Sequence, residues 1–337
     1  MIGFRVDANE NIASGHIVRC ITIAKEFVNH GYKCIFYLAE DKETWRLREN
    51  GLQYRILDSD WKNLYFEIKK MRGYIKQDSI EWLIVDSYQA NSKYLKNLNE
   101  LCKVAYMDDM GTYKYKISAV IHYGLPDSSY EKKYEKTHTL CLSGPRFIPL
   151  REEFNDENKK YKREKSILIT TGGTDKYCIT LEVLKKLVKN NTFKDYDIYT
   201  VIGSMNVFEK NILDFSKNEP RIHVLKNINN MSLYMKKSEF VISAGGTTLY
   251  ELCACMTPTV CFSFADNQYE FAKSMEREGM MLYAGDPRFD DKISESIINC
   301  LVKFKENKLL INNCIYCMKK ILDGRGARRI VDMLLKF

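Results

Sequence analysis

The feature that most constrains the fold is a repeated alternation of short apolar runs with helical patterns. Apolar runs of about five residues, such as Ile2–Val6 and Trp82–Val85, are followed by stretches with helical spacing, such as Ile17–Asn29. This alternation is typical of parallel βαβ units. It starts again at Ser166–Thr170, after a charged segment. The sequence therefore predicts an α/β fold with two Rossmann-like domains facing a ligand cleft.

The charged segment Arg151–Lys165 is nearly free of aliphatic side chains and is predicted to be the linker between the domains. A chain of 337 residues is long enough for two domains of about 150 residues each. We therefore expect an N-terminal Rossmann-like domain at 1–152 and a C-terminal Rossmann-like domain at 153–337.

Composition excludes several functional classes. The net charge of +8 comes from lysines dispersed among acidic residues, and no RNP, KH or zinc-finger pattern occurs, so we expect no nucleic-acid partner. No signal peptide is evident, and no apolar run approaches the ~20 residues of a membrane span. The eleven cysteines have irregular spacing, which indicates reduced, buried thiols; the lone Cys314–Cys317 pair is weak evidence for a metal or redox site. We expect a cytoplasmic monomer without stable membrane insertion.

The first strand leads into a polar turn, Asp7–Cys20, from which a helix starts. A helix start presents free N–H groups and favours anions. His16 lies at this start and is suited to proton transfer near neutral pH. The alternative is a histidine whose ring is satisfied by a backbone carbonyl.

Further polar side chains follow the ends of other predicted strands. Because ligands gather beyond the carboxyl ends of parallel strands, their shared location is a first indication of a functional site. Asp108 and Asp109 are adjacent and would either bind Mg²⁺ or cap the next turn. No set of side chains has convincing metal-ligand spacing, so we expect neither a metal nor another cofactor. The residues that follow strand ends are His16, Asp86, Tyr88, Asp108 and Asp109.

The strongest local motif is Ser243–Glu251, in which adjacent glycines follow an apolar strand. Gly245 and Gly246 would let the backbone approach a ligand and expose consecutive N–H groups. The hydroxyls of Thr247 and Thr248 would donate to a phosphate, and Glu251 would accept from ribose hydroxyls. The alternative is an ordinary tight turn between a strand and a helix.

Two other stretches of the second half have similar chemistry. Thr171–Asp175, with Gly173 and Thr174, repeats the glycine turn; neither turn is a Walker A loop or a GxGxxG fingerprint. Asn267 and Gln268 follow another apolar strand, where they would either bind a sugar or base or form a polar loop and helix cap.

Together these motifs resemble one enzyme family over nearly the whole chain. The family is the UDP-2,4-diacetamido-2,4,6-trideoxy-β-L-altropyranose hydrolases of pseudaminic acid biosynthesis. It is similar to the MurG-type glycosyltransferases, and the resemblance implies their two-domain glycosyltransferase-B fold. The matching motifs are Arg5–Asp7, Ser14–Cys20, Asp86–Tyr88, Gly144–Phe154, Thr171–Asp175, Ser243–Thr248, Asn267–Gln268 and Asp323–Ile330.

The resemblance implies roles for particular positions. His16 matches the family's catalytic histidine, a general base for water, and Tyr88 matches a tyrosine on the sugar side. Asn267 matches an asparagine that contacts substrate. Ala13 stands where the family often has glycine. The other positions taken as substrate-binding are Arg5, Asp7, Gly15, Gly173, Thr174, Gly245, Gly246, Thr247, Thr248, Glu251 and Gln268.

The resemblance also implies a reaction. Neutral His16 would take a proton from water, which attacks the anomeric carbon with inversion and releases UDP without a metal. The product sugar would serve the biosynthesis of pseudaminic acid for flagellin or surface glycans. Two alternatives remain open: a UDP-sugar-dependent glycosyltransferase of the MurG-like type, for which Trp45, Trp61 and Tyr65 leave room for an acceptor surface, and a non-catalytic nucleotide-sugar-binding protein.

Overall fold

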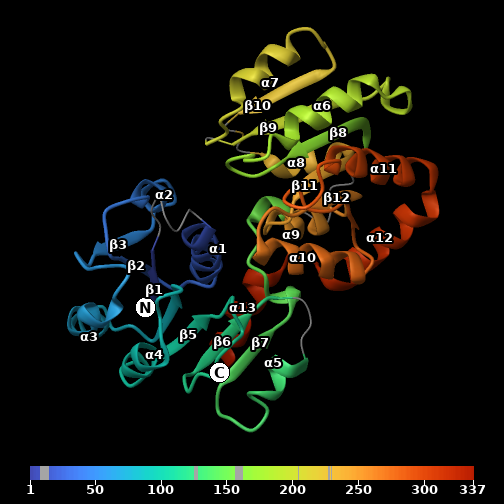
Figure 1. The fold of residues 1–337 in the computed structure, drawn as a ribbon. Coiled ribbons are helices and arrows are strands. Elements are labelled where there is room, and N and C mark those ends of the chain that lie inside the picture. The colour runs from blue at the N-terminus through green and yellow to red at the C-terminus, as the bar shows by residue number, and fades with distance from the viewer. Residues whose placement is uncertain (8–14, 125–127, 156–161, 204, 227, 229) are drawn as a thin grey trace. The chain divides into compact units, whose positions relative to one another are not determined.

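The computed structural model describes residues 1–7, 15–124, 128–155, 162–203, 205–226, 228 and 230–337 (Figure 1). Within these residues the chain forms two compact units. Unit 1 contains Met1–Glu152 and Gly324–Phe337, and unit 2 contains Glu153–Asp323. Each is built on a parallel sheet with helices between the strands, so the predicted α/β class is confirmed.

Unit 1 has a seven-stranded sheet in its described part, in the order β3-β2-β1-β4-β5-β6-β7, and every pairing is parallel. β1 and β4 are buried along their whole length, as expected for central strands covered on both faces. The strands are β1 (Ile2–Val6), β2 (Cys34–Leu38), β3 (Gln53–Ile56), β4 (Trp82–Asp86), β5 (Lys103–Met107), β6 (Ala119–His122) and β7 (Leu140–Ser143).

Alternation along the strands assigns each face of this sheet to a set of helices. Phe4 of β1 stacks on Phe36 and meets Phe27 of α1, which places α1 on that face. Leu83 and Val85 of β4 belong to the opposite cluster, which includes side chains of α3 and α4. The helical segments are α1 (Gly15–Asn29), α2 (Thr44–Glu49), η1 (Leu64–Glu67), α3 (Ile68–Gln77), α4 (Ser92–Asn99), α5 (Ser128–Lys132), η2 (Pro145–Phe147), η3 (Glu152–Phe154) and α13 (Gly326–Lys336).

Unit 2 repeats the architecture with a parallel sheet in the order β10-β9-β8-β11-β12-β13. Its strands are β8 (Glu164–Thr170), β9 (Asp197–Ile202), β10 (Ile222–Lys226), β11 (Ser238–Ala244), β12 (Thr259–Phe262) and β13 (Leu282–Tyr283). Its helices are α6 (Ile179–Lys189), η4 (Asn191–Phe193), α7 (Glu209–Ser216), α8 (Met231–Lys237), α9 (Thr248–Ala254), α10 (Asp266–Arg277), α11 (Ile293–Glu306) and α12 (Lys308–Ile321).

The last helix departs from the predicted division of the chain. The sequence assigned all of 153–337 to the second domain, whereas α13 lies in unit 1 and packs on α1 and η2. The apolar side of α13, with Ile330, Val331 and Leu334, is buried there, and Gly326 lies against the carbonyl of Ile148, where a Cβ would clash. The C-terminal helix therefore belongs to unit 1, which its position in the sequence does not indicate.

The sequence patterns did not predict α5, which has five residues, nor α12 and β13. α12 buries only Cys314 and Met318, so its apolar stripe is too narrow to stand out, and Leu309 and Tyr316 are exposed. β13 has two residues, fewer than an alternation pattern needs. The Cys314–Cys317 pair lies on or beside the buried face of α12, and all eleven cysteines of the chain are free thiols.

Both sheets have a point at which the strand order reverses direction. In unit 1 this point lies between β1 and β4, where Val6 pairs with Asp86, and in unit 2 it lies between β8 and β11, where Thr170 pairs with Ser243. Crevices beyond the carboxyl ends of such neighbouring strands are the usual ligand sites of open α/β sheets. Each unit therefore has one topologically favoured site.

Candidate active site

The unit 1 site is centred on His16, in the first turn of α1. The side chain is buried, and its Nδ1 lies 2.5 Å from Oδ1 of Asp86, the last residue of β4. An ionised carboxylate only accepts hydrogen bonds, so Nδ1–H donates, and in the neutral imidazole Nε2 then has the lone pair. A carboxylate–imidazole pair of this kind orients a histidine for proton abstraction.

The local fold explains why these two side chains meet. Side chains alternate along β4, so Asp86 shares the α1 face of the sheet with Ile84 rather than the opposite face with Val85. On α1, Arg19 and Cys20 lie one turn beyond His16 and point to the same carboxylate. The Sγ of Cys20 lies 3.5 Å from Oδ2 of Asp86.

Arg19 neutralises the buried carboxylate. Its Nε and Nη2 donate to the two oxygens of Asp86 at 2.6 and 2.5 Å. Burial by itself disfavours an ionised Asp86, but the charge and hydrogen bonds of Arg19, together with His16, hold the pKa of this carboxyl well below its usual range. Asp86 is therefore a stable acceptor for the imidazole.

Tyr88 covers the same histidine from the loop after β4. Its ring meets the imidazole of His16 edge-on, with centroids 4.6 Å apart, although 57% of the residue is exposed. The Tyr88 hydroxyl donates to Oδ2 of Asp109 at 2.9 Å. Burial and the nearby Asp109 carboxylate raise the pKa of Tyr88, so the phenol stays protonated as a donor. The structure thus brings two predicted site residues, His16 and Tyr88, together.

The two adjacent acids after β5 have different partners. Asp108 is fully buried and accepts from the backbone N–H of Gly111 and the hydroxyl of Tyr130, so it caps its own turn. Asp109 binds Arg19 and Tyr88. No group of three or more His, Cys, Asp or Glu side chains within the described ranges is arranged to hold a metal ion.

Arg5 and Asp7 are in the interior of unit 1, contrary to the expectation that they contact substrate. Arg5 is fully buried; its Nε and Nη2 donate to Glu67 at 2.6 and 2.8 Å, and its Nη1 lies 2.7 Å from Asp7. Glu67 also accepts from Tyr94 and Ser59. Asp7 accepts from the backbone of Ala39, so this charged network ties β1 to the following elements.

The turn of 8–14, including Ala13, lies outside the described residues, so the consequence of alanine there stays a prediction. Gly15 opens α1 and is exposed, with no atom within 4 Å of a Cβ placed on it.

In unit 2 the first predicted turn follows β8. Gly172 has φ +82°, and Gly173 and Thr174 are exposed. Asp175 closes the turn by accepting from the backbone N–H groups of Ile179 and Thr180 at 3.0 and 3.2 Å, which caps α6. The exposed part of this turn is therefore held by a buried carboxylate.

A third glycine, which the sequence did not single out, supports the same turn. Gly203 directly follows β9, and a Cβ there would lie 2.5 Å from the carbonyl oxygens of both Gly172 and Gly173. The backbone N–H of Met205 donates to the Gly173 carbonyl at 3.2 Å. Only glycine at 203 permits this close approach of two strand ends.

The second glycine turn joins β11 to α9. A Cβ on Gly245 would lie 3.1 Å from the carbonyl oxygen of Gln268 and 3.2 Å from that of Phe262, whereas Gly246 is open. Thr247 is exposed, and Thr248 and Glu251 are half-buried. Because β8 and β11 are neighbours, both glycine turns follow adjacent strand ends.

The Asn267–Gln268 pair opens α10 beside this turn. The amide oxygen of Gln268 accepts from the backbone N–H of Phe264 at 3.1 Å, so this side chain supports its own loop. The side chain of Asn267 lies outside the described part of the structure, so its role stays a prediction.

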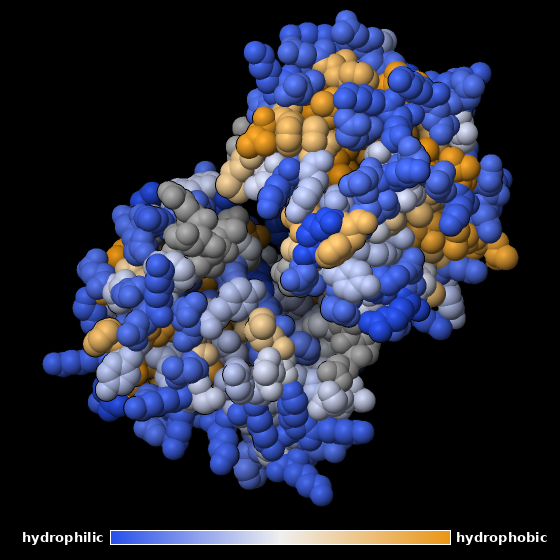
Figure 2. Space-filling model, viewed as in Figure 1, coloured by the Kyte–Doolittle hydropathy of each residue, from blue (hydrophilic) through white to orange (hydrophobic). Residues whose placement is uncertain are grey.

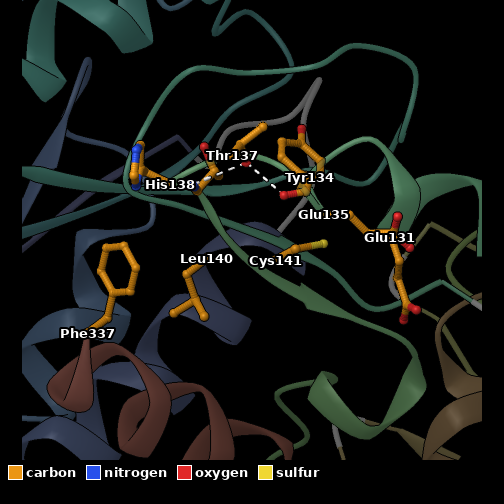
Figure 3. Close-up of a pocket in the computed structure, with 9 residues that line it drawn as sticks. Glu131, Tyr134, Glu135, Thr137, His138, Leu140, Cys141 and Phe337 are labelled. Atoms are coloured by element: carbon orange, nitrogen blue, oxygen red, sulfur yellow. Dashed lines mark hydrogen bonds between the residues drawn. The ribbon is translucent and has the colours of Figure 1, made fainter.

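Two cavities formed by described residues of unit 1 lie away from His16. One of about 590 Å³ opens at the start of β7, with Leu140, Tyr134 and Phe337 in its wall (Figure 3). A neighbouring one of about 570 Å³ shares His138 and Phe337 with it. Both are at the amino end of β7, whereas His16 lies beyond the carboxyl ends of β1 and β4.

The sequence analysis did not identify how three residues connect to His16: Asp86 and Arg19 contact it directly, and Asp109 connects to it through Arg19 and Tyr88. The signal for Arg19 was its position three residues after His16, on the same helix face. For Asp86 the signal was its place two residues after Ile84 in a buried strand, which puts both side chains on the same face of the sheet. Tyr123, which accepts from Arg19, had no comparable signal.

The fold is shared with known proteins. Residues 166–313 match the glycosyltransferase family 28 C-terminal domain. The crystal structure of MurG from Acinetobacter baumannii aligns with a TM-score of 0.70 over 100% of both chains at 14% identity. The chain is thus a two-domain protein of the glycosyltransferase-B fold class.

Sequence relatives narrow this class. The UDP-2,4-diacetamido-2,4,6-trideoxy-β-L-altropyranose hydrolase of Campylobacter jejuni is 22% identical over 281 residues, which are 82% of this chain and 96% of that protein. The spore coat polysaccharide biosynthesis protein SpsG of Bacillus subtilis is 23% identical over 340 residues, 99% of this chain and 97% of that one. Uncharacterized protein MJ1062 of Methanocaldococcus jannaschii is 28% identical over 274 residues; they are 77% of this chain, which spans about half (54%) of that relative's length.

The resemblance to the altropyranose hydrolase family is confirmed by these matches. They support an enzyme of sugar-nucleotide metabolism. None of the helices in the described part of the chain combines the length and apolar composition that a bilayer crossing requires.

Proposed function

We propose that this protein hydrolyses a UDP-linked 2,4-diacetamido-2,4,6-trideoxy-altropyranose to the free sugar and UDP, in the biosynthesis of pseudaminic acid. The observation that carries the proposal is the His16–Asp86 pair at the point where strand order reverses in unit 1. Asp86 holds the Nδ1–H group, so Nε2 has the free lone pair and takes the proton of water. Water attacks the anomeric carbon, and the bond to the UDP oxygen breaks.

The leaving UDP is assigned to unit 2. Donors for its developing charge would be the backbone N–H groups and hydroxyls of the two glycine turns, Thr171–Thr174 and Gly245–Thr248. Glu251 would accept from the ribose, and Asn267 would contact the sugar. These fixed donors would stabilise the leaving group without a metal. Attack opposite the UDP oxygen inverts the anomeric centre.

The first test is an incubation of the purified protein with the UDP-sugar and no acceptor. The proposal predicts that UDP and free sugar appear in equal amounts. NMR of the sugar at early times should show the inverted anomer. Retention of configuration would contradict single displacement.

A second candidate is a glycosyltransferase that uses the same UDP-sugar, and an exposed aromatic surface on unit 1 favours it. Tyr65 and Phe66 are 61% and 73% exposed, and the Nζ of Lys93 lies 5.5 Å from the centre of the Tyr65 ring. The face drawn in Figure 2 is largely hydrophilic, with separate hydrophobic patches. UDP release that begins only when a sugar or lipid-linked acceptor is added would establish the transferase and contradict the hydrolase.

A further inference from the structure

One guanidinium links both side chains that face the reacting centre. Arg19 donates through Nε and Nη2 to Asp86, and through Nη1 to Asp109 at 2.9 Å and to Tyr123. Asp86 holds His16, and Asp109 holds Tyr88. Two chains of contacts therefore run from Arg19, one ending at the imidazole and the other at the ring packed against that imidazole.

We propose that Arg19 is a positioning residue that fixes His16 and Tyr88 together, by gripping Asp86 with one edge of its guanidinium and Asp109 with the other. The inference rests on the proposed function only in taking His16 as the base. Nη2 of Arg19 also lies 3.3 Å from Nδ1 of His16, but Arg19 reaches the reacting atoms only through His16 and the two acids, so it is not a catalytic group.

The geometry requires an arginine. A planar fork can bind two oxygens of one carboxylate and still present Nη1 to a second acid, whereas a lysine ammonium is a single point of charge. Asp86 is 1% exposed and Arg19 is 12% exposed by side chain, so water cannot easily replace either contact. Without the fork, Asp86 would keep its charge but lose its fixed orientation.

The second chain of contacts runs from Arg19 through Asp109 to Tyr88 and restrains the Tyr88 ring. More than half of the residue is exposed, so burial alone does not hold its ring against His16. The hydroxyl contact to Asp109 supplies that restraint. Arg19 in turn fixes Asp109, whose side chain is 19% exposed. The groups facing His16 in the described residues are thus Asp86, Arg19, Tyr88 and, one step removed, Asp109.

The test is the Arg19→Lys variant of the full chain, read by nitrogen NMR of the imidazoles without substrate. Five histidines are present, and a His16→Ala sample assigns the His16 signals. In the wild type we expect neutral His16 to carry its proton on Nδ1. In Arg19→Lys we expect mixed Nδ1 and Nε2 signals, and kcat lower by about 10- to 100-fold with a smaller change in KM.

Arg55→Lys is the matched control. Arg55 binds Asp78 with Nε and Nη2 at 3.0 and 2.7 Å in the same unit, away from His16. The Arg55→Lys variant should leave the NMR signals of His16 and kcat unchanged. A folded Arg19→Lys with the wild-type His16 tautomer would overturn the inference whatever the activity, because the NMR readout needs no substrate.

Asp109→Asn covers the case in which Arg19→Lys does not fold. It leaves Arg19 on Asp86, so the tautomer of His16 should be unchanged while the Tyr88 restraint is weakened. We expect lower kcat, and the double variant with Tyr88→Phe should lose no more than the larger single loss. Additive losses, or an unchanged kcat in Asp109→Asn, would overturn the link through Asp109.

Discussion

Replacing Asp86 with asparagine removes one charge at nearly constant volume and tests the centre of the account. Asp86 accepts from His16 Nδ1, from Nε and Nη2 of Arg19, and from the Cys20 thiol, at 2.5, 2.6, 2.5 and 3.5 Å. Asparagine has a single acceptor oxygen, and its amide would present a donor to another donor. The imidazole would then no longer be held with its proton on Nδ1.

The expected losses can be scaled from these contacts. Breaking a buried ion pair typically costs 3–5 kcal/mol, and Arg19 keeps Asp109, so we expect the lower end, about 3 kcal/mol. For a unit of this size that corresponds to a Tm lower by about 10 °C. A misoriented general base should lower kcat by about 100-fold or more, since general-base catalysis contributes about 10²–10⁴.

The pH dependence has a definite sign. The pKa of folded Asp86 is depressed, so its contribution to stability is fully present above the unfolded pKa of about 3.9 and is lost as the pH falls through the lower folded value. The Tm difference between wild type and Asp86→Asn should therefore be constant near neutrality and narrow in acid.

Thermal melts by circular dichroism and initial rates of UDP release measure both effects. Asp78→Asn is the matched control, because Asp78 pairs with Arg55 and Tyr37 away from His16 and should lower Tm without lowering kcat. A folded Asp86→Asn with near-normal kcat would refute the orientation of the base by Asp86.

Three further predictions concern the base, the nucleotide turn and the leaving group. His16→Ala should lower kcat by about 10²–10⁴ while calorimetry shows unchanged UDP binding; a parallel loss of UDP affinity would contradict its role as base. Gly203→Ala should weaken UDP binding, because its Cβ would displace the Gly172–Gly173 turn, whereas Gly73→Ala, with open space around it, should not. EDTA followed by desalting should leave the rate of UDP release unchanged; restoration by Mg²⁺ of a lost rate would refute metal independence.

Local patterns were enough to predict most of the fold. Buried parallel strands read as apolar runs with polar residues at their ends, which is why β1, β4, β8 and β11 and the turns after them were predicted from the sequence. The unit to which α13 belongs was not predictable in this way. Its pattern of apolar residues identifies a helix with one buried face, but not the surface on which that face packs.

The site was only partly predictable, because its contacts join residues distant in sequence. His16 was found from its helix start, but its partner Asp86 is 70 residues away. Arg5 was taken as substrate-binding because it lies in a matched motif, and only the fold shows that Glu67, 62 residues away, accounts for its charge. A polar side chain on a buried strand can serve the site or the interior, and the choice depends on what the other elements place beside it.

Hydrolysis in ¹⁸O-labelled water tests the central claim most directly, because it reports which bond breaks. If the water activated by His16 attacks the anomeric carbon, the sugar gains ¹⁸O at C1 and the UDP released has only unlabelled phosphate oxygens. Mass spectrometry of the UDP distinguishes this from attack at phosphorus. One ¹⁸O in the terminal phosphate of UDP would contradict the account.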